Sequence, residues 1–259
     1  MDTKKTIFGD DEFSKVISVG SKIPFAKSIK KVRIELTWEG KPRIDLDICA
    51  FLLKDHKIHK RDDLVFWGSK NRWRTDKPLT DQPFEPKDVL IGSQCSFEGD
   101  KIKYGYTNPL PWMEDTLPLS GDCSVIGSWD DRGDPIPGEL SNEMIHVQLD
   151  KVDVDRHNVI VIAANVSEED IDEGCTFVNA KSPIVNVYDA EKDKLLGSYT
   201  LNTQFPNSDS VCLCKLEYDP NSWVWNFIAL AEEEDGFRGG MKFLAREVFE
   251  PTTKFYERY

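Results

Sequence analysis

The sequence predicts an all-β protein, a two-sheet antiparallel β-sandwich with a short C-terminal helix. Short apolar runs, many of them alternating with polar residues, recur along the 259 residues, and turn residues separate them. Long amphipathic helices do not alternate with these runs, as they would in a parallel βαβ sheet. Because 39% of the residues are hydrophobic, the chain can bury a core, and disorder through low hydrophobicity is excluded.

Twelve strands are expected from this pattern. The run from 32 to 38 is the clearest, because Val32, Ile34, Leu36 and Trp38 fall on one face of an extended chain. In chain order the expected strands are residues 15–19, 32–38, 45–53, 88–91, 101–106, 124–126, 144–149, 159–166, 183–188, 195–201, 211–218 and 223–231.

Two helical segments are expected beside the strands. Ser167, followed three positions later by Asp170, has the form of a capping box that opens one helical turn, and Gly174 closes that turn. Residues 240–249 are expected to form the C-terminal helix, because their apolar side chains share one stripe. We assign residues 1–232 to the sandwich and 233–259 to a C-terminal extension. The segment at about 69–121, rich in Pro, Lys, Asp and aromatic residues, interrupts the sandwich as an insertion.

The charge of the chain is concentrated in one segment. The formal net charge is −13, and residues 114–173 alone hold sixteen carboxylates against three cations. Like charges at this density are relieved by solvation, by salt or by a bound cation. Nucleic acid is excluded as a partner, because phosphate binding needs a basic stripe.

Composition also predicts a cytoplasmic protein without a membrane span. No apolar run approaches the roughly 18 to 20 residues that cross a bilayer, and no export signal follows Met1. The six cysteines are too sparse for a disulfide scaffold and are expected to be reduced. Cys212 and Cys214 are two positions apart in an expected strand, which places both on one buried face.

Two aspartates open the apolar strand at 45–53. Alternation places Asp45 and Asp47 on one side of the strand, with Leu46 and Ile48 on the other. Two carboxylates so close together repel each other unless a hard cation or a Lys or Arg partner lies between them, or one of them is protonated. A solvated or lysine-paired strand end satisfies the same spacing.

The acidic loop at 128–143 supplies a second set of oxygen ligands. It carries Asp130, Asp131, Glu139 and Glu143 and runs directly into the strand at 144–149. Calcium takes about six to eight oxygens, which a glycine-containing acidic loop can supply without strain. The loop is not an EF-hand, because the twelfth position from Asp130 is Ser141.

Enzymatic chemistry finds little support in the sequence. The motifs of nucleotide-binding loops, zinc proteases and serine hydrolases are absent, and the four histidines are scattered. His146 alternates with apolar residues in a strand and is expected to face water. We therefore predict a protein that is not an enzyme.

Read in order, these segments resemble the TerD family, known from tellurium-resistance and stress-response operons. The segments that carry the resemblance are residues 18–20 (SVG), 45–53 (DLDICAFLL), 63–67 (DLVFW) and 124–132 (SVIGSWDDR). The resemblance extends from about residue 13 to 232, apart from the insertion. It implies a calcium-binding β-sandwich without established enzymatic activity and a stress-response role that involves a protein partner, of the kind found in membrane-bound metal-stress complexes. The ligands it implies are Asp45, Asp47, Asp130, Asp131, Glu139 and Glu143.

The chain departs from the family pattern near the expected ligands. Trp129 replaces the usual glycine, and Thr176 stands where an asparagine is usual. Residues 138–143 keep only two carboxylates, Glu139 and Glu143, where the family has more. Fewer charges imply weaker calcium binding, one ion in place of two, or none.

Two other functions remain open from the sequence alone. The first is a metal-free interaction module on the same fold, which would bind a protein partner through Trp73, Trp112 and Trp129. The second is a metal-dependent hydrolase, in which Asp45 and Asp47 would hold a divalent ion that activates water.

Overall fold

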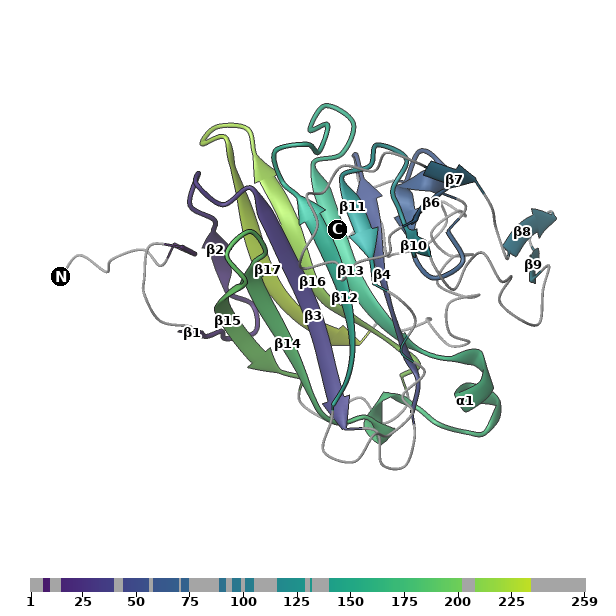
Figure 1. The fold of residues 1–259 in the computed structure, drawn as a ribbon. Helices are drawn as coiled ribbons and strands as arrows, with labels where there is room; N and C mark the ends of the chain where they lie inside the picture. The colour runs from purple at the N-terminus through teal and green to yellow at the C-terminus, as the bar shows by residue number, and fades with distance from the viewer. Residues whose placement is uncertain are drawn as a thin grey trace.

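The computed structural model describes residues 7–9, 15–39, 44–55, 58–69, 71–74, 89–91, 95–98, 101–104, 116–128, 131, 140–201 and 208–233. Two six-stranded sheets make up the body of the protein (Figure 1). The first sheet has the order β1 (Lys15–Val16), β15 (Lys194–Thr200), β14 (Lys181–Asp189), β3 (Lys31–Glu39), β12 (Ser141–Gln148) and β11 (Val125–Gly127). The second has the order β2 (Lys22–Pro24), β17 (Val224–Glu233), β16 (Ser210–Asp219), β13 (Val159–Val166), β4 (Leu46–Leu53) and β5 (Leu64–Val65).

The predicted antiparallel β-sandwich is confirmed. Each of the twelve expected strands corresponds to an observed strand, with ends that differ by a few residues. Among the paired strands of the described residues, β1 and β15 are parallel and the other pairs are antiparallel. The pattern missed five short strands, because a run of two to four residues carries too little alternation to be read.

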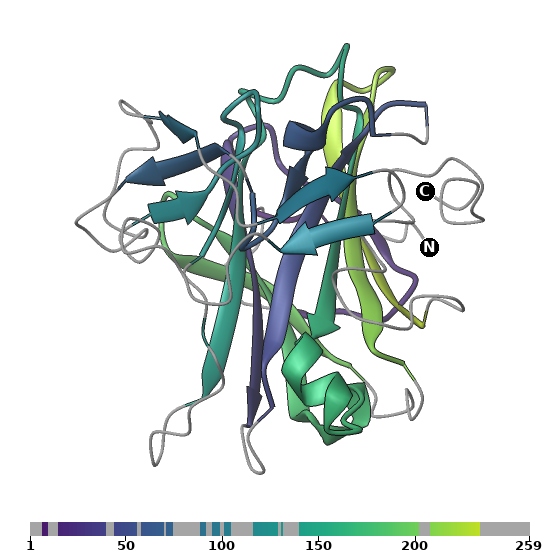
Figure 2. The same ribbon diagram turned by 90° about the vertical axis from the view of Figure 1, so that its right-hand side faces the viewer.

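Three of these missed strands belong to small sheets outside the sandwich. β6 (Asn71–Arg74) lies between β10 (Thr116–Pro118) and β7 (Val89–Ile91), and β8 (Cys95–Glu98) pairs with β9 (Lys101–Tyr104). In Figure 1 these strands lie beyond the edge where β4 and β11 run, and Figure 2 views the molecule from that side. They fall within the segment that we predicted as an insertion.

The main core fills the space between the two sheets. The side chains of Val32, Ile34, Leu36 and Trp38 on β3 are fully buried there, as the alternation predicts. A second cluster lies on the other face of β4, where Cys49 and Phe51 pack with neighbours from β5, β13 and β16. Because β4 is covered on both faces, all eight of its residues are buried.

The prediction that Cys212 and Cys214 share one face is wrong. Cys214 belongs to the core between the sheets, whereas Cys212 belongs to the second cluster on the other face. In the pairing with β13, Ile162 lies opposite Cys214 and Ala163 opposite Cys212, so Leu213 is an extra residue in β16. A β-bulge of this kind adds one residue to the alternation, so residues two apart come to face opposite sides.

Half of the predicted capping box is present at one end of the sandwich, because the Ser167 amide donates to the Asp45 carbonyl and not to the Asp170 side chain. Ser167 is the N-cap of α1 (Glu168–Asp172), and its side chain accepts a hydrogen bond from the Asp170 amide at 3.4 Å. Gly174 follows with φ +84°, a conformation that glycine adopts without strain. The helix predicted at 240–249 lies outside the described residues. No described helix combines the length and apolar composition that a membrane crossing requires.

Candidate functional site

The first residues of β4 and β12 and helix α1 lie at one end of the sandwich, which we call the α1 end. The Ser167 amide donates to the Asp45 carbonyl at 2.9 Å, and the Asp45 amide donates to the Asp170 carboxylate at 2.7 Å. The residue ahead of β4 is therefore fixed against the N-terminal turn of α1. The sequence signal for Asp170 was the capping box, but nothing in that motif indicated its contact with Asp45.

Glu143 joins the two sheets at this end. Its side chain faces the interior with only 4% of its surface exposed, in line with Ile145 on the same strand. The Ile48 amide of β4 donates to Glu143 Oε2 at 2.5 Å. β5 pairs only with Ala50 and Phe51, so Glu143 supplies the acceptor that a longer neighbouring strand would have given to Ile48.

The same carboxylate holds the acidic loop. The Asp131 amide donates to Glu143 Oε1 at 3.3 Å, and the Asn142 amide donates to Asp131 Oδ2 at 2.8 Å. These two bonds connect Asp131 to the start of β12. The other loop residues, 129–130 and 132–139, lie outside the described residues. Glu143, Asp131 and the start of β4 are thus brought together by direct contacts.

Asp45, just ahead of β4, and Asp47, within β4, lie next to this contact. Leu46 and Ile48 pack in the core between the sheets, and Asp47, which faces the other way with Cys49, is 7% exposed and lies opposite Asn165. Asp47 and Glu143 therefore approach the edge of β4 from different faces.

The six predicted ligands are only partly placed. Asp45, Asp47, Asp131 and Glu143 lie at the α1 end, whereas Asp130 and Glu139 are outside the described residues. Within the described residues, no three Asp, Glu, His or Cys side chains are arranged to hold a metal ion. Their oxygens suit a hard cation in type, but they do not by themselves fill the six to eight positions that calcium takes.

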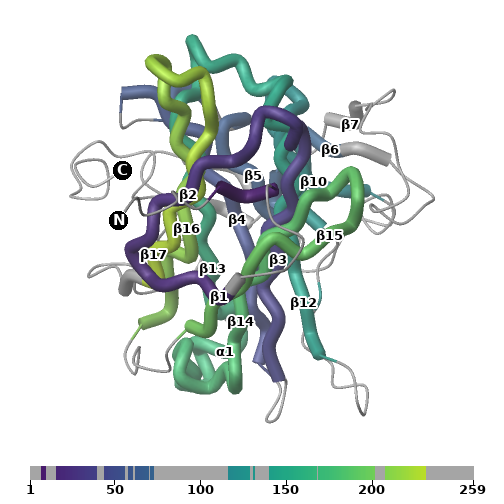
Figure 3. The backbone as a smooth tube through the Cα atoms, turned by 90° about the vertical axis from the view of Figure 1, so that its left-hand side faces the viewer, coloured from purple at the N-terminus to yellow at the C-terminus, as the bar shows by residue number. Residues whose placement is uncertain are grey.

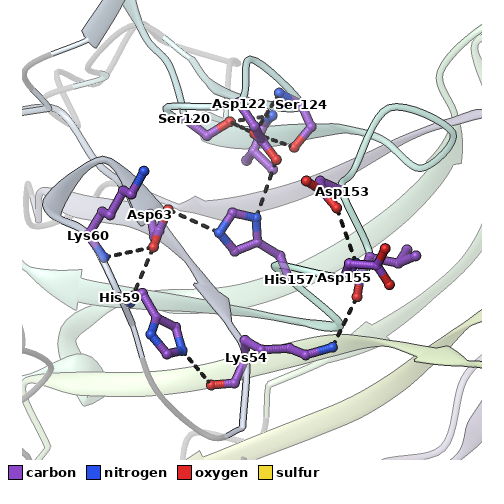
Figure 4. Close-up of polar contacts among 12 residues, drawn as sticks. Lys54, His59, Lys60, Asp63, Ser120, Asp122, Ser124, Asp153, Asp155 and His157 are labelled. Carbon is purple, nitrogen blue, oxygen red and sulfur yellow. Dashed lines mark hydrogen bonds and ion pairs between the residues drawn. The ribbon is translucent and has the colours of Figure 1, made fainter.

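A buried ion cluster that the sequence did not predict lies at the opposite end (Figure 4). His157, in the loop after β12, is 2% exposed. Its Nε2 lies 3.0 Å from Asp63 Oδ1, and its Nδ1 lies 3.4 Å from Asp122 Oδ2. Asp63 ends the 3-10 turn η1 (Arg61–Asp63), and Asp122 lies between β10 and β11.

Backbone and hydroxyl groups donate to the other oxygen of each carboxylate. The amides of His59 and Lys60 donate to Asp63 Oδ2 at 3.2 and 2.8 Å. Asp122 Oδ1 accepts from the Ser120 hydroxyl and from both the hydroxyl and the amide of Ser124. The cluster ties three loops together from positions 63, 122 and 157, whose spacing gives no recognisable motif.

The electrostatics of the cluster favour a charged imidazolium. Burial lowers the pKa of His157, but the hydrogen bonds and charges of Asp122 and Asp63 outweigh it and raise that pKa to about 9. Burial likewise raises the pKa of Asp122, yet hydrogen bonds from His157, Ser120 and Ser124 hold it well below its usual range. Because His157 is almost fully buried, the cluster is a brace between loops and does not face a substrate.

A second histidine differs from its prediction. His146 on β12 does not face water, since only 5% of it is exposed. Burial, with a smaller contribution from the charge of Arg33, lowers the pKa of His146 to about 3. His146 lies opposite Ile126 of β11, and the Ile126 side chain packs with Leu117 and Leu119.

A comparison with protein families agrees with the resemblance noted for the N-terminal part of the chain. The TerD domain matches residues 14–77, which include β3, β4 and β5. The predicted resemblance to the TerD family is confirmed. No curated protein matches the chain. Among solved structures, a homologue of the telluride resistance protein TerD from Streptomyces coelicolor A3(2) is similar, with 14% identity, a TM-score of 0.45, and coverage of 82% of this chain and 94% of that one.

The TerD match sets limits on what is confirmed. It includes Asp45 and Asp47 but ends before the acidic loop that carries Asp131 and Glu143. The ligand set and the resemblance beyond residue 77 stay predictions.

Proposed function

We propose that the protein is a non-enzymatic, tellurium-resistance-type protein that binds calcium at the α1 end. The single observation that carries the proposal is the bridging position of Glu143. One buried carboxylate contacts the amides of Ile48 and Asp131, so it fixes the acidic loop beside the aspartates of β4. Asp45, Asp47, Asp131 and Glu143 are the described ligands in this proposal, and Asp130, Glu139 and loop carbonyls supply the remaining oxygens.

A bound cation would relieve the charge that the fold gathers at this end. Asp170 and Glu143 both lie against residues 45–48, and the Asp131 amide bonds Glu143, so acidic residues from separate segments of the chain meet at this end. Calcium accepts the irregular geometry of a loop that closes against a strand edge, whereas magnesium demands near-octahedral positions and keeps its water. Bound calcium would cross-link the loop, β4 and β12 into a rigid surface.

That rigid surface is the part of the molecule that we propose for a protein partner. We propose a role in the stress response, in the cytoplasm, with a partner such as a membrane-bound metal-stress complex, and the match of residues 14–77 to the TerD domain supports the family to which this role belongs. Calcium in this scheme is structural, because it orders loops and supplies no reaction step.

The test is a melting curve at increasing calcium concentration. Binding only to the folded state adds about 2.7 kcal/mol when the free ion is at one hundred times Kd, which corresponds to roughly 5–10 °C for a chain of this size. We expect this rise for the wild type in millimolar calcium and a smaller rise in magnesium.

Variants separate calcium binding from general stability. Glu143→Gln and Asp131→Asn should lose most of the calcium-dependent rise, whatever their melting temperature without calcium. Asp172→Asn removes the same charge from an exposed position on α1 and should keep the rise. A wild-type curve that does not move in millimolar calcium would refute the proposal and favour a metal-free interaction module.

A further inference from the structure

A cavity of about 320 Å³ lies at the end of the sandwich opposite α1. Residues 25–30 after β2, residues 149–154 after β12 and the tip of the β16–β17 hairpin line it, and we call it the hairpin pocket. In Figure 3 the purple chain between β2 and β3 and the yellow hairpin reach this end, far from α1. The volume lies at the lower end of the range of small-molecule sites, about 300–1,000 Å³.

The floor of the hairpin pocket is aromatic and fixed. Phe25 and Trp225 are 2% and 6% exposed, and the Trp225 indole N–H donates to the Leu149 carbonyl at 3.1 Å. The Tyr218 ring is tilted against Trp225, with the ring centroids 5.5 Å apart. The apolar wall is already ordered in the folded protein, so a ligand would bind without a further loss of side-chain entropy in these residues.

Trp223 lies at the edge of this wall and is unusual in both its exposure and its backbone conformation. It is 75% exposed, and its φ of +58° lies in the left-handed region, which bulky side chains rarely adopt. The hairpin turn holds it there, through a 2.8 Å hydrogen bond from its amide to the Asp219 carbonyl. A large aromatic side chain held in solvent beside a cavity offers apolar surface that only a ligand would cover.

Two lysines give the rim its charge. Lys27 and Lys30 are exposed lining residues, and in the described part of the chain neither ammonium lies within 4 Å of a carboxylate. By contrast, Lys22, Lys31 and Lys192 are all in ion pairs. The rim holds one acid, Asp150, so this small region is positive in a chain of net charge −13.

Backbone hydrogen bonds fix the main chain at Lys27 and Lys30. The Leu149 amide donates to the Lys30 carbonyl at 2.8 Å, and the Ile29 amide donates to the Ala26 carbonyl at 2.9 Å in the turn that contains Lys27. Both ammonium groups thus stem from a backbone fixed next to the aromatic floor.

We propose that the hairpin pocket binds a small aromatic anion. Its ring packs against Trp223 and Tyr218, and its carboxylate or sulfonate lies between Lys27 and Lys30. The apolar wall requires a flat hydrophobic body, and the two unpaired ammonium groups require a negative head group. The site is independent of the calcium proposal, because it shares no residue with the α1 end.

The test uses 8-anilinonaphthalene-1-sulfonate as the fluorescent probe on the full chain, with displacement by 2-naphthoate and by its neutral analogue 2-naphthamide. We expect saturable, one-site binding of the probe. We expect 2-naphthoate to displace the probe at a concentration at least tenfold lower than 2-naphthamide does, because the two competitors differ in charge and hardly in shape.

Substitutions assign the binding to the pocket. The double variant Lys27→Gln/Lys30→Gln should weaken 2-naphthoate at least fivefold and leave 2-naphthamide unchanged, and Trp223→Ala should weaken both. Lys181→Gln removes an exposed lysine at the α1 end and should change neither. The melting temperature of each variant shows whether it is folded.

Three results would overturn the proposal. They are a probe signal that does not saturate, equal displacement by the two naphthalene compounds, and a lysine double variant that binds 2-naphthoate like the wild type. The double variant decides the question even if Trp223→Ala fails to fold, because both lysine side chains are exposed and make no ion pair with a described residue.

Discussion

Replacing His157 tests whether the buried cluster is an ion network. In the fold, the imidazolium lies between Asp63 and Asp122, at 3.0 and 3.4 Å, with 2% of its surface exposed. Glutamine has a similar size and its NH2 group can still donate hydrogen bonds, but it carries no charge at any pH. His157→Gln therefore removes the charge with little change in volume.

The magnitude follows from the pKa of His157. A rise from 6.5 in the unfolded chain to about 9 in the fold is worth about 3 kcal/mol of unfolding free energy. Because the folded pKa is the higher one, this stability is complete below pH 6.5 and is lost as the pH rises through 9. The wild type should thus exceed the variant by about 3 kcal/mol at pH 6, and this excess should vanish near pH 10.

Urea unfolding at pH 6 and at pH 10 measures the difference in unfolding free energy between the wild type and His157→Gln at each pH. His59→Gln is the matched control, because His59 belongs to the same loop region but is exposed. The control should be close to the wild type at both pH values. If the wild type exceeds His157→Gln by the same amount at pH 6 and pH 10, His157 is not charged in the fold and the reasoning fails.

Three further predictions concern other buried groups. His146 has a pKa lowered to about 3, so the fold should lose stability as the pH falls from 6.5 towards 3, and His146→Gln should flatten that part of a urea-unfolding pH profile. Burial raises the pKa of the Cys49 and Cys214 thiols. Mass spectrometry should find both thiols unmodified by iodoacetamide in the native protein, where the half-buried Cys123 reacts first, and fully modified in urea. A Cβ at Gly127 would lie 2.7 Å from the rigid ring of Pro118, so Gly127→Ala should cost about 1–3 kcal/mol in urea unfolding, and a variant as stable as the wild type would contradict that contact.

The fold was predictable where local pattern and burial agree. On β3 the alternation from Val32 to Trp38 matches the side chains that fill the core. On β16 the same reasoning failed, because the register shift near Leu213 is set by pairing with both neighbouring strands and not by the residues themselves. His146 failed for a related reason, since its burial depends on strand pairing with Ile126 and Arg33, which lie elsewhere in the chain.

The candidate site was predictable in composition but not in contacts. Asp45, Asp47, Asp131 and Glu143 could be named from residue type and family resemblance, because an acidic loop and a strand opened by two aspartates are local patterns. The bridging of Ile48 and Asp131 by Glu143 joins residues up to 95 positions apart. The contact of Asp170 with Asp45 spans 125 positions.

The longer strands, the N-cap of α1 and the location of the acidic charge could be predicted from the residues alone, since each depends on neighbours within a few positions. The tertiary structure alone decided which groups meet. It placed His157 between Asp63 and Asp122, and it brought Lys27 and Trp223 to one pocket from segments almost two hundred residues apart. The physical reason is that pairing of strands and closure of two sheets set distances between remote residues, and no local periodicity records those distances.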